Sequence, residues 1–413
     1  MKNIKIKGIP NRWFYFSVIL LSLYFLIRII DQSKIIWIFP LDFTNDHSAH
    51  MAMLYFLKEY GFGNLVPNWY GGFPLLKFYH PFSSFYALPF YYLFGNVQIT
   101  MFFTMMLTYA LSFITIFFLL GKNENLSKIK RFVLFLFFFG SPWGIGYFLR
   151  VGKYSELLGF LMFILLFTMI LWYKYHKLDW WFLFFIPLYS LLSITHISVF
   201  FVSSFLILSL LLIKKNKERI FIIFSGIIAM ALSSWWWWSF MMNTDGRSYG
   251  ILNGLQRSLI SAGASLNDKI SAFVIPAVFI IIFYLYWKTN NKPRKELIFY
   301  SVPLMVGLLI LTRIAIFIPF MNKPIVDTYN LMLLFLTIFL FLKINFNNLS
   351  KTIKKIFYIG LILIPLFFIC ISFIFTPFFI EHTQENKDII GLFDYVDGKI
   401  IMVGDYFSHE GYY

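Results

Sequence analysis

The sequence predicts an all-α polytopic membrane protein with about eleven transmembrane helices. The chain of 413 residues is 60% hydrophobic and only 13% charged, whereas soluble domains are about 45–50% apolar and about 25% charged. Its apolar residues form blocks of about 17–22 residues, the length that a helix needs to cross a bilayer. Clusters of basic residues separate these blocks, and the net charge is +16. Together these observations exclude a soluble enzyme and a disordered chain.

The basic clusters predict the orientation of the spans. Lys and Arg gather in cytoplasmic loops, so an even number of crossings should separate each cluster from the next. This places the N-terminus in the cytoplasm and the C-terminus outside, in a multi-pass protein of the cell membrane. The clusters fall at 2–12, 122–131, 174–177, 214–219, 288–295 and 343–355.

The apolar blocks follow one another along the chain with one long exception, the segment 180–213. A single crossing by this segment would put the last two basic clusters outside, so we predict two short helices that turn near Thr195 and His196. The first block ends in Arg28 and Asp31 without a small-residue cleavage site, so we expect it to be retained as a span. Besides the two short helices within 180–213, the predicted spans are 13–30, 99–120, 132–149, 157–173, 220–241, 271–287, 297–312, 327–342 and 356–375.

The sequence predicts two parts of unequal size. Residues 1–375 form the transmembrane domain, in which the first outer loop runs over 31–98. Segment 376–413 is richer in acids and includes Asp397-Gly398 before an apolar run, a pattern typical of a strand, a turn and a strand. So short a segment cannot bury a core of its own. Either it packs on the outer loops or it begins a soluble outer domain that continues beyond Tyr413, and we expect the second.

The first outer loop holds the most informative residues. Asp42 and Asp46 precede a stretch, 47–60, whose apolar residues recur at helical spacing, which predicts a helix lying along the membrane interface. Asp46 and His50 are four residues apart and should face the same side. Prolines disfavour a regular spanning helix in the rest of the loop. Such irregular, aromatic-rich backbone should pack onto the helix ends and cover a cavity. The prolines are Pro67, Pro74, Pro81 and Pro89.

The second outer loop places Arg150, Lys153 and Glu156 between two spans, where ionisable residues are costly and usually functional. The two cations suit a phosphate, Arg through its bidentate fork. Alternatively, they extend to lipid headgroups while Glu156 pairs with one of them.

Two further residues are expected at the same face. His196 lies at the predicted turn and Arg313 at the outer end of the ninth span. Their alternatives are a structural histidine and a contact to lipid headgroups. The run Trp235 to Trp238 is interpreted as an interfacial aromatic belt rather than a platform for a sugar.

Three motifs in the first outer loop resemble those of the GT-C superfamily of integral-membrane glycosyltransferases. They are the D-x-x-x-H of Asp46 and His50, the W-Y-x-G-x-P of 69–74 and the F-Y-x-P of 78–81. Within the superfamily, the chain is most similar to the branch labelled 6-pyruvoyl-tetrahydropterin-synthase-related membrane proteins, a label without pterin chemistry. The resemblance implies transfer of a hexose or pentose from a polyprenyl-phosphate donor to a glycan, lipid or protein acceptor on the outer face.

The resemblance also implies roles for individual residues. The catalytic carboxylate would be Asp46, with Asp42 as the reserve. Glu156 would contact the acceptor or a metal, and Arg313 the donor phosphate. If Asp46 and Glu156 converge, their oxygens suit Mg²⁺ or Mn²⁺, although many relatives need no metal.

The chemistry needs few groups. A sugar that leaves from a lipid phosphate requires one base to take the acceptor's proton and cations to hold the phosphate. We therefore predict inverting transfer with Asp46 as general base, while His50 orients the carboxylate, helps to bind a metal or contacts the acceptor. His196 would face the same cavity.

Two other classes of function remain open. A flippase for lipid-linked saccharides or a polysaccharide polymerase would carry charges along several helices at mid-membrane, whereas here the charges gather at the outer ends. A non-enzymatic scaffold would explain the aromatic residues but not the acids. The loops hold no G-x-x-x-x-G-K-[ST] sequence, and the charge pattern predicts no nucleic-acid partner.

Overall fold

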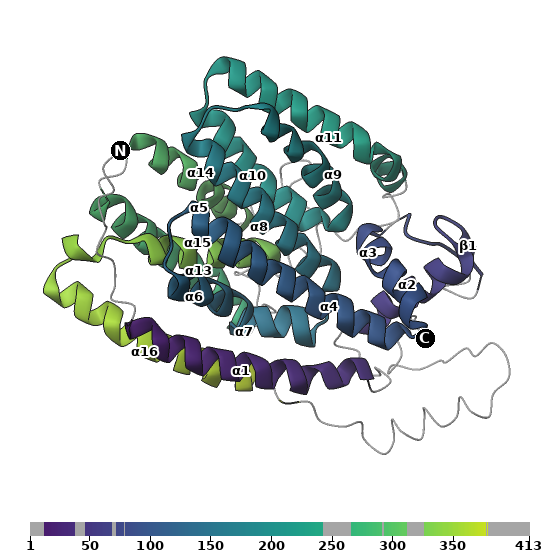
Figure 1. The fold of residues 1–413 in the computed structure, drawn as a ribbon, viewed down its shortest axis with the longest axis horizontal. Coiled ribbons are helices and arrows are strands. Elements are labelled where there is room, and N and C mark those ends of the chain that lie inside the picture. The colour runs from purple at the N-terminus through teal and green to yellow at the C-terminus, as the bar shows by residue number, and fades with distance from the viewer. Residues whose placement is uncertain are drawn as a thin grey trace.

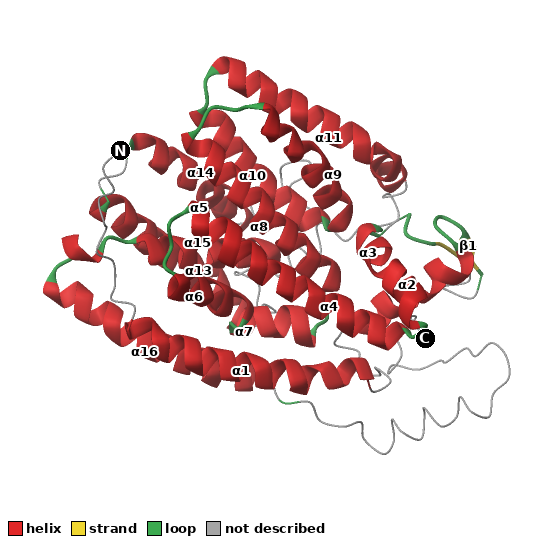
Figure 2. Cartoon of the chain, viewed as in Figure 1, coloured by secondary structure: helices red, strands yellow, loops and turns green. Residues whose placement is uncertain are grey.

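The computed structural model describes residues 12–37, 46–67, 72–77, 79–242, 266–290, 293–311, 326–376 and 378. Helices account for nearly all of the regular structure in these ranges, which confirms the predicted all-α class (Figure 2). The exception is a small antiparallel pair in which β1 (Leu65–Val66) faces β2 (Phe73–Pro74). Asp42, Arg313 and nearly all of the predicted segment 376–413 lie outside the described residues.

Each apolar block predicted from the sequence contains helix. The helix of the first block, α1, extends seven residues beyond the predicted end of the block. The helix of the second block, α4, continues through a π-helical segment, η1 (Thr115–Leu120). The bounds are α1 Arg12–Trp37, α4 Val97–Ile114, α5 Gly121–Asn123, α6 Lys128–Phe139, α8 Tyr154–Tyr175, α11 Asn216–Met242, α13 Leu266–Thr289, α14 Arg294–Leu311, α15 Val326–Lys343 and α16 Lys351–Phe375.

The described residues contain five helices that are long and apolar enough to cross a membrane. They are α1, α4 with its continuation to Asn123, α8, α11 and α16. A sixth span results if α6 and the helical turns over Pro142–Arg150 count as one, although they meet at 52°. The other apolar helices do not meet this test over their described residues, so the eleven predicted spans are not confirmed. Several long apolar helices nevertheless indicate a multi-pass membrane protein.

The bend after α6 has a local cause. Pro142 cannot supply the backbone N–H that would continue the helix. Ser141 instead starts a new turn, α7 (Pro142–Gly144), by accepting a hydrogen bond from the Gly144 N–H at 3.0 Å. The chain then runs through η2 (Ile145–Arg150) to the start of α8.

The long segment 180–213 is split, as predicted. A 3-10 turn, η3 (Trp180–Phe184), leads into α9 (Phe185–Thr195), and α10 (Ile197–Ile213) begins directly after His196. The Tyr189 and Ser204 hydroxyls, on either side of this break, are 2.7 Å apart. The two helices therefore fold back on each other as a hairpin.

The segment between α1 and α4 contains the helix that was predicted, and another that was not. The helix α2 (His47–Tyr60) has the expected bounds. The prolines were expected to prevent a spanning helix in this part of the loop, and the helix that forms there, α3 (Phe82–Phe94), is a short one. Pro81 stands just before its first turn, where the missing N–H needs no helical partner, and Pro89 is accommodated inside. With 13 residues, α3 is too short to be a span.

The centre of the molecule is α8. In the most apolar 18-residue stretch of α8, 78% of the residues are buried, whereas the corresponding shares are 33% for α1 and 22% for α16. The helices α4, α9 and α10 pack around it, and α1 and α16 run side by side along one edge (Figure 1). Residues 154–156 at the start of α8 are all buried, so its first turn is an enclosed position.

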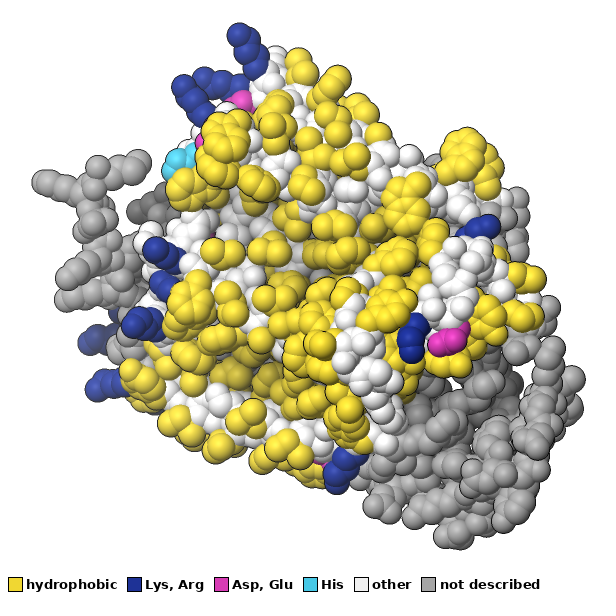
Figure 3. Space-filling view, turned by 45° about the vertical axis from the view of Figure 1, so that its right-hand side comes forward, with side chains coloured by type: hydrophobic (Ala, Val, Ile, Leu, Met, Phe, Trp, Pro, Cys, Tyr) yellow, Lys and Arg dark blue, Asp and Glu magenta, His cyan; other side chains and the backbone are white. Residues whose placement is uncertain are grey.

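The basic clusters gather at one end of the helix bundle, which we call the basic end. There Lys343 pairs with Glu124, Lys174 pairs with Glu296, and Lys214 donates to the His176 carbonyl. On the face that Figure 3 shows, many of the visible Lys and Arg side chains lie along this edge, while apolar side chains cover much of the remaining surface. The first turn of α8, the start of α10 and α2 lie at the other end, which we call the site end.

Candidate functional site

The N-terminus of α2 is fixed to the loop that precedes α8. The Asp46 N–H donates to the Val151 carbonyl at 2.6 Å, and the His47 Nε2 lies 2.9 Å from the Leu149 carbonyl oxygen. Gly152 has a φ of +73°, and a Cβ on it would lie 2.6 Å from the His47 ring. Only glycine satisfies both constraints. This contact brings Asp46 next to the start of α8.

Asp46 and Lys153 form an ion pair at the site end. The Lys153 Nζ lies 2.6 Å from Asp46 Oδ2, and the side chains are 30% and 37% exposed, respectively. Asp46 stands at the N-cap position of α2 but makes no side-chain capping bond, so its carboxylate turns toward Lys153. The structure thus joins two residues that were predicted to belong to one site.

His50 follows Asp46 by one helical turn and is buried. Its ring contacts the Tyr79 and Tyr154 rings edge-on, with centroids 5.9 and 5.8 Å away. Burial lowers the pKa of His50 to about 4, although the nearby Asp46 carboxylate acts in the opposite direction. Burial lowers the pKa of His47 as well. Near neutral pH His50 is therefore uncharged, and within the described residues its ring makes no hydrogen bond to Asp46.

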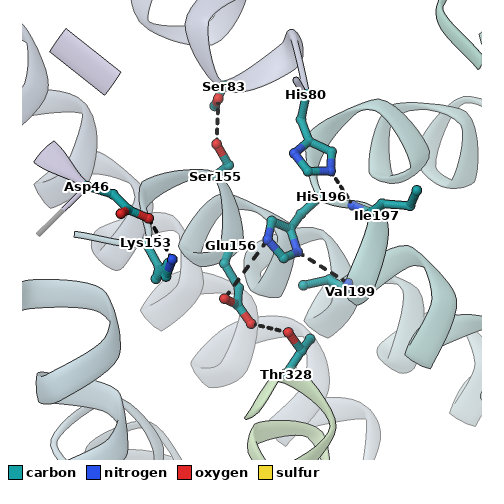
Figure 4. A network of polar contacts seen from close by, with 10 residues as sticks. All are labelled: Asp46, His80, Ser83, Lys153, Ser155, Glu156, His196, Ile197, Val199 and Thr328. Atoms are coloured by element: carbon teal, nitrogen blue, oxygen red, sulfur yellow. Dashed lines mark hydrogen bonds and ion pairs between the residues drawn. The ribbon is translucent and has the colours of Figure 1, made fainter. Parts of the chain in front are cut away.

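Glu156 lies on the same turn of α8 as Lys153, yet its carboxylate is directed into the protein (Figure 4). It is 1% exposed. The Thr328 hydroxyl of α15 donates to Glu156 Oε1 at 2.6 Å, and the His196 Nε2 lies 4.0 Å from Oε2. Glu156 therefore links α8 to α15 and to the start of α10.

Hydrogen bonds indicate the tautomers of the two histidines in this network. The Val199 N–H donates to His196 Nδ1 at 3.4 Å, so in neutral His196 the Nε2 carries the proton and faces Glu156. The Ile197 N–H donates to His80 Nε2 at 2.8 Å, so the proton of neutral His80 is on Nδ1. The two rings stack with their centroids 5.0 Å apart. Figure 4 shows His80 reaching this network from the segment before α3.

His80 was assigned no role from the sequence, and Trp236 was predicted only as part of the aromatic belt. His80 occupies the variable position of the F-Y-x-P motif, which gave the only sequence signal for it. Trp236 also packs against His80, with ring centroids 5.7 Å apart, and donates from Nε1 to the Leu76 carbonyl at 3.1 Å. Trp236 is buried whereas Trp235 and Trp238 are exposed. The aromatic-belt interpretation therefore fits the two exposed tryptophans but not Trp236.

Close packing holds the first turn of α8 in place. The Ser155 and Ser83 hydroxyls are 2.8 Å apart, which ties α8 to α3. A Cβ on Gly159 would lie 3.2 Å from the Cβ of His196, so the glycine permits the close approach of α10. Lys153, Ser155 and Glu156 thus contact four different parts of the chain from a single turn.

The structure brings together some predicted site residues and not others. His196 is within electrostatic reach of His50 and Lys153, and His50 of Asp46. Arg150, half-buried at the end of η2, is within electrostatic reach of Arg28 on α1. The cavity predicted under the aromatic segment stays a prediction. A groove of about 450 Å³ lies elsewhere, between α9, α10 and α11, and its lining is apolar.

The arrangement of the acids does not favour a metal site. Asp46 is engaged by a cation, Lys153, and Glu156 is engaged by Thr328 on the inward side. Among the described residues, no three His, Cys, Asp or Glu side chains come close enough to bind one ion. The predicted Mg²⁺ or Mn²⁺ therefore takes no part in the function proposed below.

No protein-family model matches this chain. The curated proteins contain no match to it either. The site must be interpreted from its own geometry and from the motifs of the sequence.

Proposed function

We propose that the protein is a membrane glycosyltransferase. It moves a sugar from a polyprenyl-phosphate donor to an acceptor on the outer face of the cell membrane, with inversion at the anomeric carbon. The observation that carries this proposal is the pair of Asp46 and Lys153, a carboxylate and an ammonium 2.6 Å apart and both partly exposed. These are the two groups that the reaction needs, a proton acceptor and a cation for the phosphate.

The proposed reaction uses each of these groups once. The acceptor hydroxyl attacks the anomeric carbon and gives its proton to Asp46. The bond between that carbon and the phosphate oxygen breaks, and the electron pair stays on the polyprenyl phosphate. Lys153 stabilises the negative charge that develops there, and Arg150 and Arg313 are proposed as further contacts to the phosphate.

The position of the pair supports a lipid-linked substrate. Asp46 and Lys153 lie at the site end, opposite the basic clusters, which by the positive-inside rule face the cytoplasm. A phosphate on a polyprenyl chain sits at the membrane surface, where α2 is proposed to lie. In this proposal the shorter apolar helices complete eleven crossings, and the resemblance of the loop motifs to GT-C enzymes agrees with the assignment.

Glu156 and His196 support the site rather than carry out the chemistry in this proposal. Both are buried, and Glu156 bonds to Thr328. Because Glu156 shares a helical turn with Lys153, its contacts to α10 and α15 hold in place the backbone from which the Lys153 side chain extends.

The alternative is a flippase or a polysaccharide polymerase. A flippase needs charged groups along the path of its headgroup, at mid-membrane. The described ion pairs lie instead at the two ends of the bundle, with Lys174 and Glu296 at the basic end and Asp46 and Lys153 at the site end. Chemistry at one face therefore fits their placement better than transport.

The test compares Asp46→Asn with Glu59→Gln, which removes an exposed acid from the same helix. The purified protein, in lipid nanodiscs, is incubated with a panel of polyprenyl-phosphate sugars and a lipid extract as acceptor, and released polyprenyl phosphate is measured. Asp46→Asn should lower the rate by about 100-fold or more, and Glu59→Gln should leave it unchanged.

Two results would count against the proposal. Native rates in Asp46→Asn would refute Asp46 as the base. If the native protein consumes none of the donors but moves a lipid-linked saccharide across proteoliposome membranes, the flippase alternative is correct.

A further inference from the structure

We propose that Lys153 is a mobile counter-ion, which pairs with Asp46 in the resting protein and moves to the donor phosphate during transfer. The inference rests on the proposed function, and it adds a step that couples donor binding to the base. In the absence of donor, Asp46 is engaged. When a phosphate takes Lys153, the carboxylate becomes available to the acceptor hydroxyl.

The ion pair itself makes such a step necessary. Asp46 can act as a base only by accepting a proton, and a protonated Asp46 no longer attracts Lys153. While the two groups remain 2.6 Å apart, their attraction opposes the proton transfer. A second anion that accepts Lys153 removes this opposition.

The exposure of the pair permits the exchange. The side chains of Lys153 and Asp46 are 30% and 37% exposed, so water can solvate each charge while the pair is open. Partly exposed pairs are weak, whereas a fully buried pair leaves an uncompensated charge when it opens. A phosphate at the surface can therefore compete for the ammonium.

The two partners differ in how firmly the fold holds them. The backbone of Asp46 is anchored to Val151, and the next residue, His47, is fully buried against Leu149. Lys153 carries its charge on a flexible four-carbon stem. The structure therefore holds the base in place and leaves the cation able to move.

The charges move in a way that draws Lys153 along. Before transfer Asp46 is an anion, and the donor is a phosphodiester with a single negative charge. As the acceptor's proton reaches Asp46, this carboxyl becomes neutral. As the bond from carbon to oxygen breaks, the phosphate gains the negative charge that Asp46 loses. An ammonium that follows this charge binds the transition state more strongly than the resting state, which is the condition for catalysis.

The test uses carbodiimide as a cross-linker without added amine. The reagent activates the Asp46 carboxylate, the Lys153 amine attacks it, and an amide forms with net loss of one water. Mass spectrometry of the digested protein detects the joined peptides. Lys58 and Glu59, an exposed pair 3.9 Å apart on α2, provide an internal control whose cross-link no phosphate should change.

Polyprenyl phosphate should reduce the Asp46–Lys153 cross-link severalfold in native protein in nanodiscs, while polyprenol without phosphate should not. Inorganic phosphate and vesicles of phosphatidylglycerol are parallel arms. Competition by either would also support the exchange and would show that the phosphate itself is recognised. Lys153→Arg, which keeps the charge but cannot form the amide, should give no cross-link and should transfer sugar faster than Lys153→Met, which loses the charge.

A cross-link that persists after native mass spectrometry shows bound polyprenyl phosphate would overturn the inference, as would equal loss with polyprenol. These failures differ from failure of the proposed function. A protein that transfers sugar but keeps its cross-link lacks only the mobile counter-ion. If phosphate abolishes the cross-link but the protein consumes no donor, the ion pair responds to phosphate and the proposed transferase activity is wrong.

Discussion

The two ends of α8 carry the same kind of ion pair in opposite surroundings. At the basic end, Lys174 lies 3.0 Å from Glu296, and the side chains are 4% and 2% exposed. At the site end, Lys153 and Asp46 are 30% and 37% exposed. Opening a buried pair leaves charges without solvent, whereas opening an exposed pair costs little. Burial therefore makes the pair of Lys174 and Glu296 a structural contact that stays closed, whereas the pair of Lys153 and Asp46 is able to open and react.

The surroundings of the two pairs strengthen this contrast. The Tyr175 hydroxyl also donates to Glu296, and Lys174 lies 4.7 Å from the centre of the Phe299 ring. These contacts tie α8 to α14. At the site end, the helices are joined by hydrogen bonds of Ser155 and Glu156, and the charged pair stands apart from them.

The largest expected effect comes from breaking the buried pair. Glu296→Gln removes the carboxylate and leaves the Lys174 ammonium buried, which should lower the free energy of unfolding by about 3–5 kcal/mol. Unfolding in detergent, followed by circular dichroism, measures it. The control is Glu59→Gln, because Glu59 is exposed. Equal stability of Glu296→Gln and Glu59→Gln would refute the distinction between a structural ion pair at the basic end and a reactive ion pair at the site end.

The next effect concerns the pH dependence of stability at the site end. Its low pKa of about 4 leaves buried His50 neutral in the folded protein, while an unfolded histidine binds a proton below about 6.5. The contribution of neutral His50 to the free energy of unfolding is therefore fully present above about pH 6.5 and is lost as the pH falls toward 4. The loss should reach on the order of 3 kcal/mol. Asp46, His47, Lys153 and His196 are the charged and titratable groups that interact with this ring, which also packs against Tyr79 and Tyr154.

The test of this dependence is His50→Gln, which should lose less stability than the native protein between pH 7 and pH 4. Thermal unfolding over this range measures the difference. Met51→Leu alters a buried neighbour on the same helix and should lower the whole curve without changing its slope. If His50→Gln and the native protein show the same slope, the buried neutral histidine is not the cause.

The smallest expected effect is that of the exposed pair on stability. Lys153→Met should change the free energy of unfolding by less than about 1 kcal/mol, because partly exposed pairs contribute little. The measurement is the one used for Glu296→Gln. A loss as large as that of Glu296→Gln would show that Lys153 is structural, and any loss of transfer in this variant would then reflect unfolding.

Sequence patterns predicted the local elements well. The helical spacing over 47–60 gave the bounds of α2, and the charge pattern predicted the break at His196. Asp46 and Lys153 were predicted to be site residues because charges are rare in this chain, and the structure pairs them. The short helix α3 was not predicted, because its prolines were expected to prevent a spanning helix and leave the backbone irregular. One of these prolines stands before α3 and the other is accommodated within it.

Contacts between distant segments were beyond the sequence. Asp46 and Lys153 are separated by 107 positions, and Glu156 and Thr328 by 172. His80 gave no signal besides its place in a motif, because its importance depends on a backbone N–H at the start of α10. Such a donor cannot be identified without the packing of the helices.

The sequence by itself determined that this is a helical membrane protein with its basic clusters between apolar blocks, because helix length and local charge are properties of neighbouring residues. Only the tertiary structure decided which charges pair and which of them water reaches. Glu296 and Asp46 are both acids paired with a lysine of α8, and the packing of other helices around each of them makes one pair permanent and leaves the other able to exchange its partner.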